Sequence, residues 1–196
     1  MKTTLLMMAT IVAMVFTSCK KTVDVAPSGI VVSFKPDPSV SSQMVQPAVN
    51  NQLLFTGIFN TGSINGFSLR NITVTLNRGG DATVPQTYLR QPYCTVDGGV
   101  TQLKIEKKDS ITSNEFSFPN IVHNIAQYQT RSIRIYGDIL SSATNNTGAE
   151  DNLILSVRLT YTGFDGTRTE YFQTESIDGQ KIIFNGTPVS PLFSVT

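Results

Sequence analysis

The sequence has little of what metal, redox and nucleic-acid chemistry require. Its 196 residues include no Trp, one His and two Cys. A structural zinc site takes its ligands mainly from Cys and His, so this set cannot supply one, and mechanisms that need two histidines are excluded. Only 15% of residues are charged, with 15 Lys and Arg against 14 Asp and Glu. This near balance excludes a protein that binds nucleic acid mainly by charge.

The remaining composition is that of a folded chain. Hydrophobic residues make up 40% of it, which is too apolar for intrinsic disorder. There are 14 Gly and 9 Pro, and they follow no fixed period, so fibrous and solenoid architectures are excluded. The length suits one domain after any targeting segment is subtracted.

The first nineteen residues predict an export signal. A basic start, Met1-Lys2, precedes an apolar run over residues 5–16. That run is too short to cross a hydrocarbon core of ~30 Å as a helix. A charged start, an apolar centre and small residues before a cleavage point are typical of a secretory signal peptide.

The end of this signal, Phe16-Thr17-Ser18-Cys19, resembles the lipobox of bacterial lipoproteins of the Bacteroidota type. The resemblance implies that Cys19 is acylated on sulfur and becomes the new N-terminus. Phe16 departs from the aliphatic residue usual at its position. Two or three acyl chains anchor a protein stably, so we expect an envelope protein tethered to the membrane, most simply the outer membrane, through Cys19. We divide the chain into a signal peptide (1–18), the lipidated Cys with a flexible stalk (19–28) and one β-sandwich domain (29–196).

Alternation of apolar and polar residues dominates the domain and predicts strands. It is clearest over residues 71–76, 132–139 and 153–162. Gly-containing turn dipeptides such as Asn65-Gly66 and Asp178-Gly179 separate the runs. We therefore predict an all-β, antiparallel β-sandwich, immunoglobulin-like in the broad sense, with roughly eight to ten strands. Further runs are at 30–35, 53–59, 87–96, 103–106, 116–118, 167–174 and 182–184.

Three local predictions can be checked against the structure. Residues 153–174 should form a long hairpin whose inward row includes Leu155, Val157 and Leu159, with Arg158 and Thr160 on the other face. The Pro- and Ser-rich stretch 36–47 should cross an edge or change sheet. Residues 121–128 are the one segment that could form a helical turn.

No catalytic constellation is apparent. With Cys19 used for lipid, Cys94 is the only other thiol, so no intramolecular disulfide can form. Cys94 could be a nucleophile only with His123 as its base, and we expect it to be a small buried hydrophobe instead. His123, without nearby carboxylates, is more simply a surface polar residue than a metal ligand. The Gly-x-Ser-x-Gly and phosphate-loop motifs are missing. We predict a protein that is not an enzyme and needs no cofactor.

Two further groups have a binding interpretation beside a structural one. Tyr88, Tyr93 and Phe164 could form an aromatic platform for sugars, or be core and cross-strand partners. Glu150-Asp151 supplies carboxylates for calcium, or forms a polar loop. We favour the structural interpretation of both groups. Asp109-Ser110-Ile111 resembles the O-glycosylation acceptor of Bacteroidota, which would place a glycan on Ser110.

Three functional classes follow. The first is a non-catalytic interaction or adhesion module of the envelope, which we favour. The second is a module that binds glycan or another extracellular ligand for nutrient uptake. The third is an assembly subunit, because the lipobox and fold class resemble lipoprotein-derived fimbrial subunits of Bacteroidota, which exchange strands. Those subunits are cut after a basic residue, and here the early basic residues are only Lys20, Lys21 and Lys35.

Overall fold

The computed structural model describes residues 32–79, 88–97, 103–106, 111–140, 152–164 and 169–184. They form thirteen strands in two sheets, and no α-helix is found among them. The strands are β1 (Ser33–Pro36), β2 (Gln43–Val45), β3 (Gln52–Asn60), β4 (Asn65–Gly79), β5 (Leu89–Asp97), β6 (Leu103–Glu106), β7 (Glu115–Phe118), β8 (His123–Asn124), β9 (Thr130–Ile139), β10 (Asn152–Phe164), β11 (Thr169–Gln173), β12 (Ile177–Asp178) and β13 (Ile182–Phe184).

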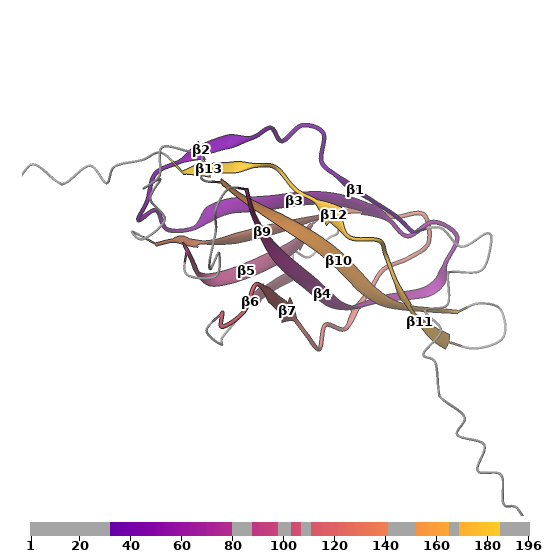
Figure 1. Cartoon of the computed structure of the whole chain (residues 1–196). Helices are drawn as coiled ribbons and strands as arrows, with labels where there is room; N and C mark the ends of the chain where they lie inside the picture. Colours follow the sequence, from indigo (N-terminus) through magenta and orange to yellow (C-terminus); the bar gives the residue numbers. More distant parts are fainter. Residues whose placement is uncertain are drawn as a thin grey trace, which may run out of the picture.

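The architecture is the predicted β-sandwich. A five-stranded sheet has the order β1-β3-β9-β5-β6, and an eight-stranded sheet follows the path β2-β13-β10-β4-β7. In the eight-stranded sheet β11 and β12 also pair with β10, and β8 pairs with β4. Figure 1 shows β4 and β10 in front of the strands of the other sheet. The strands beyond the expected eight to ten are short ones, such as β8 and β12, whose two residues give too little alternation to be recognised.

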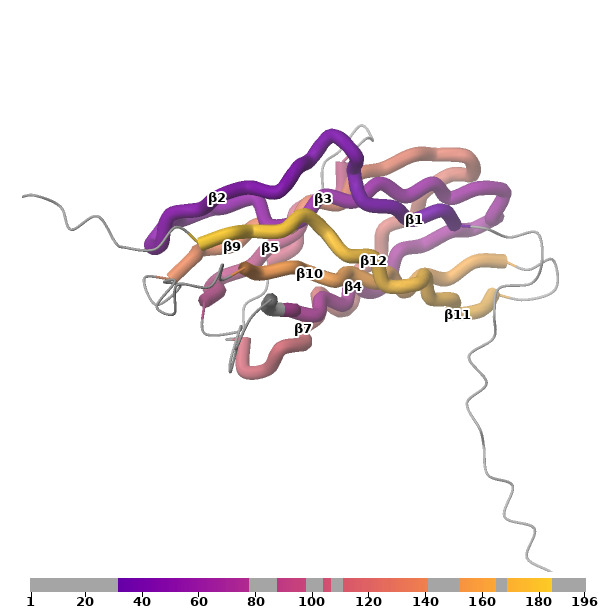
Figure 2. Tube along the Cα trace, turned by 45° about the horizontal axis from the view of Figure 1, so that its top comes forward, coloured from indigo at the N-terminus to yellow at the C-terminus, as the bar shows by residue number. Residues whose placement is uncertain are grey.

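The Pro-rich stretch changes sheet as predicted. β1 belongs to the five-stranded sheet, whereas β2 belongs to the eight-stranded one. There β2 pairs with β13 in parallel, so the purely antiparallel prediction is wrong at this edge. The indigo β2 runs beside the yellow C-terminal strand in both views of the chain (Figures 1 and 2). A parallel pair is feasible here because most of the domain connects its two strands.

The predicted hairpin is confirmed. β10 pairs antiparallel with β11 from Phe164↔Thr169 to Thr160↔Gln173. Leu155, Val157 and Leu159 are fully buried, with no exposed surface. The opposite face is more covered than alternation suggests, because Ser156 and Thr162 are also buried. β10 pairs with β4 on one side and with β11 on the other, so neighbouring strands cover its short polar side chains.

Two local predictions are wrong. The alternating run at 53–59 predicts that Leu53 faces inward, but Leu53 is half-buried and Leu54 is fully buried, because a bulge between Leu53 and Phe55 of β3 inserts one residue. Segment 121–128 contains the strand β8 and a turn instead of a helical turn. The backbone N–H groups of Ile121 and Ile125 donate to Arg70 O (3.0 Å) and Phe67 O (3.0 Å) of β4, so they are not available to a helix.

The core joins the two sheets through stacked rings. Phe59 of the five-stranded sheet stacks on Phe67, with centroids 5.8 Å apart. Phe67 stacks on Tyr161 at 4.9 Å, and Tyr161 on Phe172 at 5.6 Å. Burial raises the pKa of Tyr161 to about 12. This aromatic row fixes one end of the sandwich and the register of β10 against β4.

A close contact at Gly137 gives a prediction for the five-stranded sheet. A Cβ placed there would lie 2.4 Å from Leu89 Cδ1 and 3.2 Å from Leu54 Cδ1. We therefore expect Gly137→Ala to lower the free energy of unfolding by ~1–3 kcal/mol, the usual cost of overpacking. Ser132→Ala, on the outer face of the same strand, should change it by less than ~0.5 kcal/mol. Urea denaturation measures both, and equal effects of the two variants would contradict the assigned faces.

Candidate functional site

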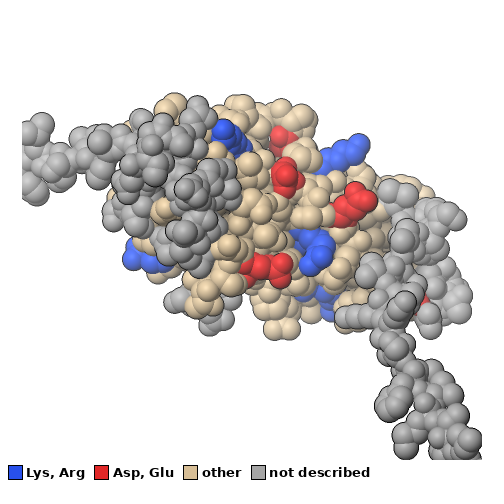
Figure 3. Space-filling view, in the orientation of Figure 1, with Lys and Arg blue, Asp and Glu red and all other residues tan. Residues whose placement is uncertain are grey.

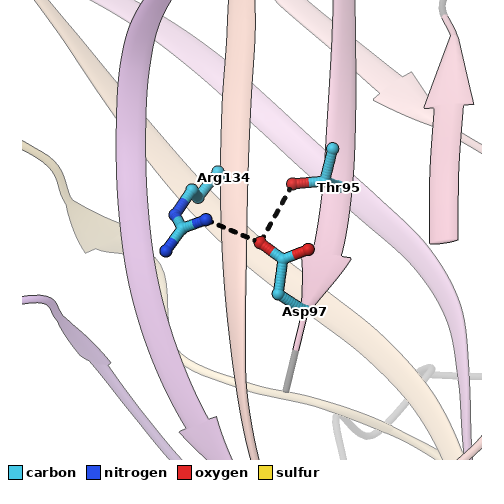
Figure 4. A network of polar contacts seen from close by, with 3 residues as sticks. All are labelled: Thr95, Asp97 and Arg134. Atoms are coloured by element: carbon cyan, nitrogen blue, oxygen red, sulfur yellow. Dashed lines mark hydrogen bonds and ion pairs between the residues drawn. The ribbon is translucent and has the colours of Figure 1, made fainter. Parts of the chain in front are cut away.

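The outer face of the five-stranded sheet carries charges that are paired with one another. Arg134 of β9 donates to Asp97 of β5 at 2.9 Å, and Thr95 Oγ1 lies 3.4 Å from the same carboxylate oxygen (Figure 4). Arg90 and Asp138 are 3.8 Å apart. Arg134 and Arg90 therefore each form an ion pair with a carboxylate of the same face.

Tyr93 and Tyr136 are cross-strand partners on this face. Their rings stack with centroids 5.0 Å apart and an interplanar angle of 12°. Lys104 Nζ lies 4.4 Å from the centroid of the Tyr93 ring and 2.9 Å from Glu106. Tyr93 Oη donates to Asn51 Oδ1, and the Asn51 N–H donates to Asp138 at 3.0 Å. The polar groups of this face are thus engaged with one another, while Arg90, Lys104 and Glu106 keep more than half of their side-chain surface exposed.

The outer face of the eight-stranded sheet is different in kind. Hydroxyl and amide side chains of β4 and β10 alternate with the inward core residues and face one another across the strand pair. Thr73 lies opposite Arg158, and Asn71 lies opposite Thr160. We call this surface the arginine face and define it by Ser68, Arg70, Asn71, Thr73, Thr75, Ser156, Arg158, Thr160 and Thr162.

A β-bulge places Arg70 on this face. Asn71 pairs with Thr160 and Leu69 with Tyr161, so Arg70 is the inserted residue. Bulges redirect side chains out of the regular alternation. Arg70 Nε donates to Thr162 Oγ1 at 3.3 Å. The guanidinium of a β4 residue is thereby held over β10.

Neither arginine of this face has a carboxylate partner in the described part of the chain. The described ion pairs all lie on the five-stranded sheet, and none includes Arg70 or Arg158. Arg158 Nε is buried and makes no hydrogen bond to a described group. Ser68 Oγ and Asn71 Oδ1 are likewise buried and make no hydrogen bond to a described group. Three of the five such atoms found in the described residues therefore belong to the arginine face.

The arginine face is thus the better candidate for binding. An unpaired guanidinium presents a planar set of donors that fits a carboxylate in two-point contact. In the orientation of Figure 1, basic and acidic side chains are interspersed over a mostly uncharged surface (Figure 3). Individual arginines, and not a broad basic field, would recognise a partner here.

The two predicted catalytic candidates lie apart. Cys94 is fully buried on β5, where its register partner on β9 is Ile135. His123 is half-buried on β8 of the eight-stranded sheet. β8 pairs with β4, on the side of that sheet away from β13. Burial, and secondarily Arg131, lowers the pKa of His123. Cys94 is the buried hydrophobe that we expected, whereas His123 is less exposed than expected because β8 pairs with β4.

Burial of Cys94 gives a prediction about its reactivity. Loss of hydration raises the pKa of the thiol to about 12. At pH 8 the folded protein then contains almost no thiolate, which is the nucleophilic form. We expect a disulfide reagent to leave Cys94 unmodified until denaturant is added. Rapid modification of the native Cys19→Ala protein would contradict this assignment.

The three aromatic residues proposed as a sugar platform do not come together. Tyr88 packs against Phe184 of the core, with centroids 5.5 Å apart. Tyr93 stacks with Tyr136 on the five-stranded sheet. Phe164 is 39% exposed at the end of β10. Tyr88 and Tyr93 thus have the structural roles that we favoured.

The remaining candidate residues lie outside the part of the chain that the structure describes. Cys19, Ser110 and the proposed calcium ligands Glu150 and Asp151 all lie outside the described residues. Within the described ranges, no group of three or more His, Cys, Asp or Glu could hold a metal ion. No helix in the same ranges has the length and apolarity to span a membrane.

Comparisons with known proteins provide no family. No family model matches the chain, and no curated protein does. Among solved structures, AvmM, which catalyses macrocyclization in alchivemycin A biosynthesis, aligns with a TM-score of 0.45 and 7% identity over 84% of this chain and 93% of its own. The collagen binding subdomain ACE19 of the Enterococcus faecalis surface protein ACE aligns at 0.35 and 11% over 78% and 95%. A family 123 glycoside hydrolase from Clostridium perfringens aligns at 0.31 and 8%, over 80% of this chain and 27% of the hydrolase. Likenesses this distant transfer neither activity nor ligand.

Proposed function

We propose that this protein is a non-catalytic interaction module of the bacterial cell envelope. It is tethered to the outer membrane by acylated Cys19 and binds a partner protein through the arginine face. The lipobox and the export signal support the tether. The single observation that supports the binding surface is the pair Arg70 and Arg158, which have no carboxylate partner among the described residues.

A protein partner fits this surface better than a glycan. Arginine is enriched at protein interfaces and often contributes much of their affinity. Sugar sites use aromatic rings as platforms, and the exposed ring that borders the arginine face, Tyr171 opposite Thr162, lies at its end, four residues along β10 from Arg158. We therefore expect a partner that presents Asp or Glu side chains to Arg70 and Arg158, with further contacts to the half-buried Asn71, Thr75 and Thr160.

Photo-crosslinking in cells of the source organism tests this function. A photoreactive amino acid at position 160 lies on the arginine face between the two arginines, and one at position 132 is the matched control on the other sheet. We expect position 160 to give a discrete protein adduct that disappears in the Arg70→Ala and Arg158→Ala variants. Adducts only from position 132, or adducts unaffected by loss of both arginines, would contradict the proposed surface.

A further inference from the structure

Exposed apolar side chains gather at one end of the sandwich. Five large hydrophobic residues in the described part of the chain are exposed: Met44 (67%), Val122 (68%), Tyr128 (68%), Phe164 (39%) and Tyr171 (73%). Tyr128, Phe164 and Tyr171 lie at the end of the sandwich where β3 connects to β4, whereas Val122 lies further along β4, near Arg70. We call Tyr128, Phe164 and Tyr171 the aromatic end.

Hydrogen bonds and strand register place these three residues at the same end. Phe164 pairs with Asn65, the first residue of β4. The Tyr128 N–H donates to Gly62 O at 2.7 Å, in the turn just before Asn65. Tyr171 of β11 pairs with Thr162, which comes two residues before Phe164 on β10. Val122 is not part of this group, because its neighbours Ile121 and His123 contact Arg70 and Leu69, further along β4.

The described chain begins at this same end. Ser33, the first residue of β1, pairs with Asn60, the last residue of β3. Figure 1 shows the start of β1 and β11 towards one end, with β2 and β13 at the other. Met44 belongs to β2 and therefore marks the opposite end. The proposed anchor at Cys19 thus connects to the sandwich at the aromatic end.

The connecting segment is short compared with the sandwich. Residues 20–31, twelve in number, separate Cys19 from Val32. A random chain of this length spans roughly 20 Å on average. β10 alone, with its thirteen residues, is about 40 Å long at ~3.3 Å per residue. The opposite end would therefore reach the bilayer only with the connection almost fully extended.

We propose that the aromatic end rests on the lipid bilayer to which Cys19 is attached, so that the long axis of the sandwich rises from the membrane. This inference depends on the anchor in the proposed function, but not on the arginine face. Tyr side chains are favoured at membrane interfaces because one part of the ring is apolar and the hydroxyl group is polar. In this orientation Arg158 and the outer face of the five-stranded sheet are directed away from the bilayer, whereas Thr162, the partner of Tyr171, and Arg70, which donates to Thr162, lie next to the aromatic end.

The absence of Trp makes a direct test possible. Tyr171→Trp and Tyr128→Trp each introduce the only indole of the chain at the aromatic end, and Met44→Trp introduces it at the opposite end with similar exposure. Each full-length variant is expressed with a palmitate analogue, purified from membranes and reconstituted in phosphatidylethanolamine–phosphatidylglycerol vesicles. Trp emission is then recorded with and without lipids that carry a quenching nitroxide on the acyl chain.

We expect emission from Trp at 171 and 128 to shift to shorter wavelength and to be quenched, and emission from Trp at 44 to remain unchanged. A labelled protein with no quenching at 171 and 128, or with equal quenching at 44, overturns the orientation alone. Protein that carries no label overturns the anchor and the orientation together.

A Cys19→Ala chain that sediments as a dimer, and as a monomer after Tyr171→Ser, would assign the aromatic end to a second copy instead. Loss of the arginine-dependent adducts described above has no bearing on quenching, so the two proposals fail separately.

Discussion

Replacement of Leu155 or Leu159 by Ala is expected to lower the free energy of unfolding by ~2–5 kcal/mol, because both side chains are fully buried between the sheets. A domain is stable by only ~5–15 kcal/mol. Either variant should therefore melt many degrees below the parent protein in a thermal denaturation experiment. The loss combines the transfer free energy of the removed methyl groups with the cavity that remains.

The matched substitutions lie on the opposite face of the same strand. Arg158→Ala and Thr160→Ala should change the melting temperature little, because both residues are half-buried and contribute no inward packing. The strand period of two makes the comparison sensitive to register, since a slip of one residue would exchange the faces. A larger loss at positions 158 and 160 than at 155 and 159 would show that the faces are reversed.

The second large effect is expected at the proposed anchor. Cys19→Ala should abolish incorporation of a palmitate analogue and leave the signal peptide uncleaved at that site, because acylation needs the thiol. A single acyl chain binds membranes only marginally, whereas two or more hold a protein stably, so the variant should also lose stable membrane association. Cys94→Ala is the control, because Cys94 is buried in the core. Labelling that persists in Cys19→Ala would exclude the lipoprotein assignment.

Much of the fold could be predicted from the sequence, because strand alternation carries the information directly. Leu155, Val157 and Leu159 lie inward as their spacing indicates, and the stretch after Pro36 changes sheet. The errors arise where tertiary contacts override the local pattern. A bulge exchanges the roles of Leu53 and Leu54, and β4 takes the N–H groups of residues 121 and 125 that a helix would need.

The candidate binding face was harder to predict. Arg158 could be assigned to an outer face by alternation, but Arg70 reaches that face through a bulge that leaves no local sequence signal. Nothing in the sequence indicates which cations lack carboxylates, because partners such as Arg134 and Asp97 are 37 positions apart in the chain. The structural roles that we favoured for Tyr88 and Tyr93 are confirmed, but the sequence did not indicate that the two rings lie on different sides of the sheet. Tyr88 and Tyr93 are five residues apart, with the bulge of β5 between them. Tyr88 packs against Phe184 of the core, whereas Tyr93 stacks on Tyr136 at the outer face of the five-stranded sheet.

The most direct test of the proposed function is the affinity of the partner identified by crosslinking for single variants of the two outer faces. Binding to the purified protein is measured by calorimetry at one fixed salt concentration. We predict that Arg70→Ala and Arg158→Ala each raise Kd about tenfold or more, since interface arginines often contribute at least ~1.4 kcal/mol. Arg134→Ala, which removes a paired arginine from the five-stranded sheet, should leave Kd unchanged. An unchanged Kd for both Arg70→Ala and Arg158→Ala, or a larger loss in Arg134→Ala, would contradict the assignment of the arginine face.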